Sequence, residues 1–527
     1  MSASDKPKRK TLGIKTDGEA STQAPTGYRP PVRGRHLPNA AKPRTKKAAE
    51  ERQAQRKPAP DESQAAGEPP RRRKPPQTQE RQEGRRDEGR RDFPRDENAP
   101  RRRPRPVTET PPWEETRGER DEERGENSRP RRGKPAPKRY GSTPGAGGVQ
   151  HFFVPCPRGL ENELVAELAE IGVDETRPAP GGVAFRGNLP LAWRVNLWSR
   201  LAVRVLWRVG EGPYHQESDL YDGALKVDWP DLFEVSRTIA VHTVARHSPL
   251  QSLNFASLKV KDAVCDRFRS QYGERPSVDT HTPDIPLVLY LTEDRYSLYI
   301  DLSGEPLNRR GFRVEPAAAP LNENLAAGLL RLSGWRPGTP FFDPMMGGGT
   351  LLIEAAMMWL NRAPGLKRHF AFENLKSFDR IEWQRLRKDA EGDALEPESL
   401  PIFGTDIDPA MVRAAGLNLK AAGLLDCVQL LEADFLEVDA PPTDPGVIVS
   451  NPPYGVRLSL EDMAAFYKAM GDVLKRKYPG WSAYLISADP ELPKHIGLSA
   501  SRRTPLFNGP LECRFYAYRL VAGSNRR

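Results

Sequence analysis

The second part of the chain, from about residue 306 to 527, alternates short apolar runs with segments of helical spacing. Runs of this length that stand between helical segments are expected to be strands. They cover residues 339–343, 402–406, 428–431, 447–450, 483–487 and 515–521. The alternation predicts an α/β fold with a doubly wound, largely parallel sheet. In such a sheet, ligands bind at the carboxyl ends of the strands.

Residues 149–305 have a less regular order of strands and helices, which predicts a separate α+β domain. Expected strands lie near residues 151–154, 183–185, 202–209, 238–244, 287–291 and 297–302, and expected helices near 159–171, 189–198, 219–226 and 250–269. Trp193, Trp198 and Trp207 are interpreted as core residues rather than as surfaces for stacked bases.

Residues 1–148 are basic and rich in proline. They hold 38 of the Lys and Arg residues, 23 of the Asp and Glu residues and 22 of the prolines, a net charge of +15 against −5 for the remainder. Few apolar side chains are available to offset the entropy of ordering, so the segment is expected to be disordered. Its arginine clusters, such as 71–74 and 101–103, suit non-specific contacts with RNA phosphates. The alternative is a solvating tail without a specific partner.

The four cysteines are widely separated and do not pair with histidines at metal-ligand spacing. No disulfide framework and no metal site are therefore expected. The chain also has no run of eighteen apolar residues and no apolar signal core, so a cytoplasmic protein without membrane segments is expected.

The tetrapeptide Asn451-Pro452-Pro453-Tyr454 directly follows the apolar run 447–450. The two prolines have fixed φ angles and no N–H groups, so nearby carbonyls can point outward. The Asn451 side chain and the Pro452 carbonyl can then accept hydrogen bonds from an –NH2 group, while Tyr454 stacks on the ring that carries it. The motif predicts methylation of an amino nitrogen conjugated to a planar system. Alone, it could also be a simple turn at a strand end.

A glycine-rich segment follows the first strand and opens a helix at Thr350. Gly347 and Gly349 allow the backbone to approach a bulky ligand, with Asp343 at the strand end. Pro344 and Met345 complete the segment, and Asn451 is expected to face the same ligand.

Two further acids end neighbouring strands. Asp406 is placed to accept hydrogen bonds from two ribose hydroxyls, and Asp434 can accept from an adenine amino group while Phe435 packs on the ring. Either acid could instead cap a helix. A nicotinamide cofactor is disfavoured, because the glycine spacing is not G-x-G-x-x-G.

The expected helix 250–269 carries Lys259 and Lys261 together with Asn254, Ser257, Arg267 and Arg269. A basic face of this kind can bind a phosphate backbone. The alternative is an ordinary solvated helix face.

These motifs resemble those of S-adenosylmethionine (SAM)-dependent class I methyltransferases. Residues 342–350 are similar to their D-P-x-C-G-S-G-T loop, although Met346 and Gly348 replace the common Cys and Ser, and residues 451–455 are similar to their N-P-P-Y motif. Residues 151–304 resemble a ferredoxin-like region followed by a THUMP RNA-binding domain. The junction that includes residues 308–313 resembles the R-G-Y/F-R segment of the bacterial 23S ribosomal RNA guanine-N2 methyltransferase family.

This resemblance implies a Rossmann-like methyltransferase domain that uses SAM and no metal to methylate the exocyclic N2 of a guanine in 23S ribosomal RNA. It implies that Arg309, Arg310 and Arg313 hold phosphates near the pocket, with a salt-bridged linker as the alternative. Long relatives carry a second methyltransferase that makes 7-methylguanine, an activity not expected here. Other substrates left open are a guanine in tRNA, adenine N6 in DNA and a protein glutamine, and an inactive RNA-binding assembly factor also remains possible from sequence.

Overall fold

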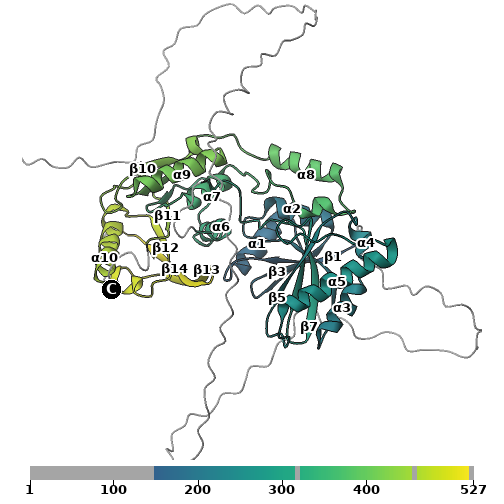
Figure 1. Cartoon of the computed structure of the whole chain (residues 1–527). Helices are drawn as coiled ribbons and strands as arrows, with labels where there is room; N and C mark the ends of the chain where they lie inside the picture. Colours follow the sequence, from purple (N-terminus) through teal and green to yellow (C-terminus); the bar gives the residue numbers. More distant parts are fainter. Residues whose placement is uncertain (1–147, 315–320, 454–459, 522–527) are drawn as a thin grey trace, which may run out of the picture. The chain divides into compact units, whose positions relative to one another are not determined.

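The computed structural model describes residues 148–314, 321–453 and 460–521 (Figure 1). The predicted tail therefore lies outside the described residues. The described residues form two seven-stranded sheets, one before and one after the junction near residue 305. The predicted combination of an α+β region and a doubly wound α/β domain is confirmed.

The first sheet begins with a βαββαβ unit whose strand order is β2-β3-β1-β4. This is the ferredoxin-like arrangement, in which the first and third strands are neighbours. Its elements are β1 (Gln150–Pro155), α1 (Glu161–Ile171), β2 (Thr176–Ala179), β3 (Gly182–Gly187), α2 (Leu189–Trp198) and β4 (Leu206–Pro213).

The same sheet continues past β4 in the order β4-β7-β6-β5. The added elements are α3 (Glu217–Leu225), α4 (Trp229–Leu232), β5 (Ile239–Ala245), α5 (Leu253–Tyr272), β6 (Ile285–Leu291) and β7 (Arg295–Asp301). β5 pairs in parallel with β6, and β7 pairs antiparallel with both β4 and β6. One continuous sheet therefore joins this region to the ferredoxin-like unit.

The apolar spacing of α1 explains its position in the first domain. Leu160, Leu164 and Leu168 are buried, as the periodicity predicts. Gly172 then ends the helix with φ of 100°, a conformation that glycine adopts without a side-chain clash. Trp193 and Trp207 are also buried, which confirms their assignment to the core.

The second sheet has the order β10-β9-β8-β11-β12-β14-β13. β10, β9, β8, β11 and β12 run parallel, whereas β14 pairs antiparallel with β12 and β13. The strands are β8 (Phe341–Asp343), β9 (Ile402–Asp406), β10 (Gln429–Glu432), β11 (Val447–Ser450), β12 (Ser482–Ser487), β13 (Arg502–Asn508) and β14 (Leu511–Arg519). Strand order reverses between β8 and β11, so a ligand site is expected there.

Residues after the junction also form helices, several of which cover the second sheet, although the helix before β9 lies beside α2 of the first domain (Figure 1). They are α6 (Glu323–Leu332), α7 (Thr350–Trp359), α8 (Arg380–Gly392), α9 (Pro409–Ala422), α10 (Leu460–Lys477) and α11 (Leu492–His495), with 3-10 turns η1 (Ala371–Asn374) and η2 (Leu425–Cys427). The segment between α7 and β9 also contacts the first domain. Phe372 stacks on Trp193 at 5.4 Å between ring centroids, and the Gly365 N–H donates to the Leu197 carbonyl at 2.9 Å.

The described residues also bear on the expectations for cysteines, metal sites and membrane segments. All four cysteines are buried and free of disulfide bonds. Within residues 148–314, 321–453 and 460–521, no group of three or more His, Cys, Asp or Glu side chains could hold a metal ion. In the same ranges, none of the helices combines the length and apolar character needed to span a membrane.

Candidate active site

The predicted site residues converge on the carboxyl edge of the second sheet. Asp343 ends β8, Asp406 ends β9 and Ser450 ends β11. In the parallel register, Asp343 pairs with Gly404, and Ile448 of β11 pairs with Phe342. Because these strands run in the same direction, the segments that follow them meet at one edge.

The glycine loop between β8 and α7 is held against the end of β9. The Gly347 N–H donates to Oδ2 of Asp406 at 2.9 Å, and the Met346 N–H donates to the Thr405 carbonyl at 2.9 Å. The Thr405 hydroxyl in turn donates to the Pro344 carbonyl at 2.9 Å. These three bonds tie the loop to the end of β9 and so fix its path.

Both predicted glycines of this loop have positive φ angles, 52° at Gly347 and 77° at Gly349. A Cβ at Gly349 would lie 3.1 Å from the Cβ of Ala415, so close packing against α9 also favours glycine there. At Gly347, no described atom lies within 4 Å of such a Cβ. Gly347 therefore faces space in which a ligand could approach the backbone.

Asp343 is a buried carboxylate at the centre of this edge. Its Oδ1 accepts hydrogen bonds from the Ser450 hydroxyl at 2.8 Å and from the Met345 N–H at 3.3 Å. Burial raises the pKa of Asp343 to about 7; the bond from Ser450 opposes this shift, and the nearby negative charge of Asp406 adds to it. No Lys, Arg or His of the described chain forms an ion pair with it, so a cationic ligand would complement the site.

Asp406 is half-buried and already accepts two backbone hydrogen bonds, from Gly347 at Oδ2 and from Asp408 at Oδ1. These bonds orient the carboxylate while leaving lone pairs for ligand hydroxyls. The next residue, Ile407, is 67% exposed and was missed by sequence reasoning. An exposed apolar side chain beside the acid that is predicted to bind the ribose suits the face of a purine ring. Its position directly after the strand could have revealed it in the sequence.

Asp434 and Phe435 differ in how well they match their predicted roles. Asp434 is half-buried and accepts a hydrogen bond from the Leu436 N–H at 2.9 Å, so it remains near the edge. Phe435 is instead buried, and its ring lies 5.8 Å from that of Tyr478. The ring fills the core beneath the end of α10, which differs from the expected packing on adenine.

The Asn-Pro-Pro segment directly follows β11. Oδ1 of Asn451 is buried and has no hydrogen-bond partner among the described residues. Pro452 is buried and Pro453 is exposed. Tyr454 lies outside the described residues, so its stacking role remains a prediction. A buried acceptor without a partner is costly in a folded protein, and it points to a donor supplied by a ligand.

The structure corrects the predicted role of Arg310. Its side chain is only 2% exposed, and its Nε donates to Oε1 of Glu354 at 3.0 Å. The two remaining guanidinium nitrogens donate to the Leu307 and Arg200 carbonyls, each at 2.7 Å. Each of its three guanidinium nitrogens donates to a group inside the protein, and the side chain is buried, so Arg310 belongs to the salt-bridged junction that the sequence left open as the alternative to a phosphate contact.

Arg313 is likewise committed to the protein, through Oε1 of Glu323 at 3.1 Å and the Leu321 carbonyl at 2.9 Å. Arg309 differs, because its side chain is 69% exposed and has only a long ion pair of 3.6 Å with Glu305. Arg309 thus remains a candidate for contact with a phosphate.

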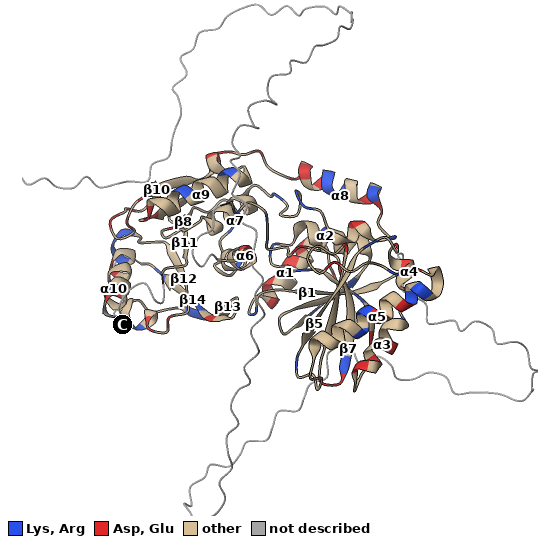
Figure 2. Cartoon of the chain, viewed as in Figure 1, with Lys and Arg blue, Asp and Glu red and all other residues tan. Residues whose placement is uncertain are grey.

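The helix α5 carries Lys259 and Lys261 among both basic and acidic residues (Figure 2). Lys259 is half-buried with its ammonium group 5.2 Å from the centroid of the Phe255 ring, and Lys261 forms an ion pair with Asp262. Because the two lysines are two positions apart on the helix, their side chains do not share one face, and their role in binding RNA stays a prediction.

Comparison with family models agrees with this division of the chain. Residues 151–206 match an RlmL ferredoxin-like domain, residues 214–301 match a THUMP domain, and residues 310–517 match an RMKL-like methyltransferase domain. The three matches follow one another in the order expected from sequence.

Two curated relatives and one solved structure are similar over most of the chain. A protein of Synechocystis sp. named putative RNA methyltransferase is 36% identical over 70% of this chain and 96% of its own length. The ribosomal RNA large subunit methyltransferase K/L of Shewanella frigidimarina is 36% identical over 72% of this chain, which spans only 54% of that enzyme. A crystal structure of a methyltransferase named as putative, in complex with S-adenosylhomocysteine (SAH), shares 30% identity, with a TM-score of 0.66 over 71% of this chain and 99% of the other.

Proposed function

The chain belongs to the SAM-dependent RNA methyltransferases that carry ferredoxin-like and THUMP domains before an RMKL-like methyltransferase domain, and from this premise we propose that it methylates the exocyclic N2 of a guanine in 23S ribosomal RNA. The product would be 2-methylguanosine. The observation that carries the amino-group assignment is the Oδ1 of Asn451 at the end of β11, which is buried and has no hydrogen-bond partner among the residues that the structure describes.

The described residues fit SAM in three respects. Gly347 offers open backbone, Asp343 is a buried carboxylate without an ion pair in the described part of the chain, and Asp406 is oriented by two backbone bonds at the next strand end. When bound, SAM supplies an electrophilic methyl group on a sulfonium. We assign Asp406 to the ribose and Asp434 to the adenine amino group, and we add Ile407 as an apolar contact for the purine.

The protein's part in the transfer is to hold the amino group in position. The target guanine must leave its stack, at a cost of about a few kcal/mol. Oδ1 of Asn451 and the Pro452 carbonyl would accept hydrogen bonds from the two N2–H groups, which directs the nitrogen lone pair away from the ring and toward the methyl donor. When N2 bonds to the methyl group, the carbon–sulfur bond breaks and SAH leaves, and N2 then loses one proton to water. Rate enhancement comes from alignment and from removal of water, and needs no covalent nucleophile.

Ribosomal RNA is favoured as the substrate by two lines of support. The relative from Shewanella frigidimarina is named for methylation of large-subunit ribosomal RNA, and this chain spans about half of its length. A THUMP domain also precedes the methyltransferase domain here. Arg309 is the exposed cation of the junction that we assign to a phosphate contact.

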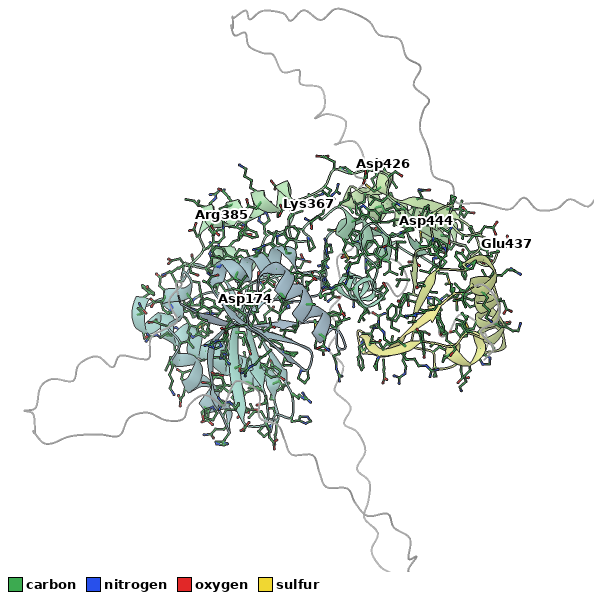
Figure 3. The ribbon with its side chains drawn as sticks, turned by 180° about the vertical axis from the view of Figure 1, so that it is seen from behind. Asp174, Lys367, Arg385, Asp426, Glu437 and Asp444 are labelled. Atoms are coloured by element: carbon green, nitrogen blue, oxygen red, sulfur yellow. The ribbon has the colours of Figure 1, made fainter. Side chains whose placement is uncertain are left out.

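Nucleoside mass spectrometry of a strain that lacks the gene tests this proposal. We expect one 2-methylguanosine to disappear from 23S RNA and to return with the wild-type gene but not with Asn451→Ala. Asp444→Ala changes an exposed residue of the loop before β11 (Figure 3) and should restore the modification fully.

Two other outcomes would contradict the proposal. If the deletion strain keeps every 2-methylguanosine of its 23S RNA but loses one from tRNA, the substrate is tRNA. A full set of modified nucleosides, together with no heat in a calorimetric titration with SAM, would indicate a catalytically inactive RNA-binding protein.

A further inference from the structure

Three strands of the second sheet carry a buried hydroxyl at or next to their carboxyl end. Thr405 of β9 donates to a backbone carbonyl, that of Pro344, and Ser487 of β12 accepts from the Asp489 N–H at 3.0 Å. Ser450 of β11 instead donates to a carboxylate, Oδ1 of Asp343, at 2.8 Å. Ser450 is thus the member of this set that bonds to a charged side chain.

The carboxylate that Ser450 contacts has few other stabilising partners. Besides Ser450, only the Met345 N–H donates to it within the described chain, again at Oδ1. The charged group that acts on it is Asp406 from β9, which has the same sign. A buried charge is unfavourable without a counter-charge, and SAM brings two positive groups, a sulfonium and an ammonium.

Ser450 also directly precedes Asn451, whose Oδ1 is buried and without a partner in the described ranges. β8 and β11 are adjacent and parallel, with Phe342 opposite Ile448. The hydrogen bond between Ser450 and Asp343 therefore connects the ends of these two strands. β8 ends in the acid at the cofactor edge, and β11 leads to the amide that we assign to the substrate.

We propose that Ser450 is a positioning residue for methyl transfer: its hydroxyl fixes the Asp343 carboxylate to face the ammonium group of SAM and holds the first residue of the substrate-binding segment beside it. This inference rests on the use of SAM and does not depend on which nucleoside is methylated.

Calorimetry on the full chain with two ligands separates this role from a merely structural one. SAM carries the ammonium group, whereas 5′-methylthioadenosine keeps the nucleoside and the sulfur but lacks the amino-acid part. For Ser450→Ala we expect about a tenfold weaker affinity for SAM at pH 7.5, the scale of one lost hydrogen bond to a charged group. Affinity for 5′-methylthioadenosine should stay within about twofold of wild type.

The pH dependence gives a second readout. The pKa of Asp343 is raised to about 7, so wild-type affinity for SAM should fall as pH drops through that value. The Ser450 bond stabilises the ionised form of Asp343, so its loss should raise the pKa of that group further. The affinity for SAM should therefore begin to fall at a higher pH in Ser450→Ala than in wild type. The ammonium of SAM itself loses its proton near pH 8, so variants are compared at equal pH.

Ser450→Thr keeps the hydroxyl and should restore both the affinity and the pH profile. Ser487→Ala removes an equally buried hydroxyl from the adjacent strand β12 and should leave both unchanged. Circular dichroism establishes that each variant is folded. If Ser450→Ala does not fold, Ser450→Cys replaces it, with a weaker donor and a smaller shift in the same direction.

Either of two results would overturn the proposal. One is an equal loss of affinity for SAM and for 5′-methylthioadenosine in the Ser450 variant. The other is an unchanged pH profile. Since no RNA enters these titrations, their failure would leave the guanine-N2 proposal standing, and failure of that proposal would leave the Ser450 result unaffected.

Discussion

Glu354 and Asp343 are both buried carboxylates of the methyltransferase domain, but they differ in their partners. Glu354 on α7 lies 3.0 Å from Nε of Arg310 and 3.6 Å from Nη1 of Arg200, two cations from outside its own helix. Asp343 has no ion pair with any described residue and lies near a second acid, Asp406. The first group joins the two domains, whereas the second stands at the edge where ligands are expected.

The junction shows how a buried polar group is satisfied for a structural role. Glu167 of α1 accepts from the Ser199 hydroxyl at 2.6 Å and from the Arg200 N–H at 2.9 Å. Asp301 at the end of β7 pairs with Arg204. At the catalytic edge, by contrast, Asp343 lacks a counter-charge and Oδ1 of Asn451 lacks a donor in the described chain. The buried carboxylates of the junction therefore have cations or hydrogen-bond donors from the protein, whereas a ligand would have to supply the cation that Asp343 lacks among the described residues.

The largest expected effect is on stability at the junction. Glu354→Ala leaves two buried arginines without their common carboxylate, so we expect a loss of about 3–5 kcal/mol in the free energy of unfolding. Denaturant titration measures this. Asp472→Ala removes an exposed carboxylate that pairs with Lys468 and should cost no more than about 1 kcal/mol. Equal losses of unfolding free energy in the two variants would show that the buried carboxylate of the junction stabilises the protein no more than an exposed one.

At the catalytic edge, the largest expected effect is on rate. Asn451→Ala should lower kcat by about 10²–10³-fold, the scale for one polar group that acts on the transition state. The variant should be at least as stable as wild type, because the change removes a buried acceptor that has no partner among the described residues. Single-turnover transfer at saturating SAM measures the rate, and a loss below about fivefold would contradict the role of this amide.

Asp343→Asn should stabilise the protein in the absence of SAM. The carboxyl of the folded chain has a pKa of about 7 against an ordinary value of 3.8, so the folded state holds its proton more tightly than the unfolded state. The stability contribution of this group is complete below about pH 4 and is lost as pH rises through about 7. The full linkage is about 4 kcal/mol, and this value already includes the opposing effect of the Ser450 bond on the pKa.

Denaturant titrations of Asp343→Asn and wild type at pH 5 and pH 8 check this sign. The variant should be the more stable protein at pH 8, with a smaller difference at pH 5, and it should bind SAM at least about tenfold more weakly. A variant that is less stable than wild type at pH 8 would show that the carboxylate is satisfied by the protein itself.

The smallest expected effect concerns the exposed arginine of the junction. Arg309→Ala should change the unfolding free energy by less than about 1 kcal/mol. Its affinity for RNA should fall uniformly across sequences, and the slope of log affinity against log salt should decrease by about one. Filter binding over a salt series measures this, and an unchanged slope would exclude a phosphate contact at Arg309.

Much of the second domain could be predicted because its motif residues end or directly follow apolar runs that form strands. Residues 402–406 and 447–450 were expected as strands and match β9 and β11. Asp406 and Asn451 end or follow these strands, so their meeting at one edge follows from parallel pairing alone. The buried state of Oδ1 of Asn451 could not be inferred, because it depends on packing between distant segments.

Elements at sheet edges and in polar segments were missed. β2 and β13 are edge strands containing Pro178 and Pro505, and an edge strand can form without the apolar alternation that reveals a strand. α8 buries few side chains, notably Trp383 and Ala390, so its apolar periodicity is weak. β4 begins at Leu206, after the buried residues of a preceding loop that sequence reasoning placed within the strand.

The arginines of the junction show a second limit of sequence. Arg309 and Arg310 are adjacent and chemically identical, yet one is exposed and the other is buried against Glu354. Their difference depends on a carboxylate 44 residues away on α7. Charge patterns show that cations are present, but only tertiary structure shows which of them have an internal partner.

We propose above all that a site at the carboxyl edge of the second sheet binds SAM and a guanine, and that the methyl group passes from SAM to guanine N2 there. The most direct measurement is incubation of large-subunit RNA from the deletion strain with the enzyme and methyl-labelled SAM, followed by digestion to nucleosides. We predict that the label appears in 2-methylguanosine with wild-type enzyme. Label in 6-methyladenosine, or equal labelling by Asn451→Ala, would contradict the account.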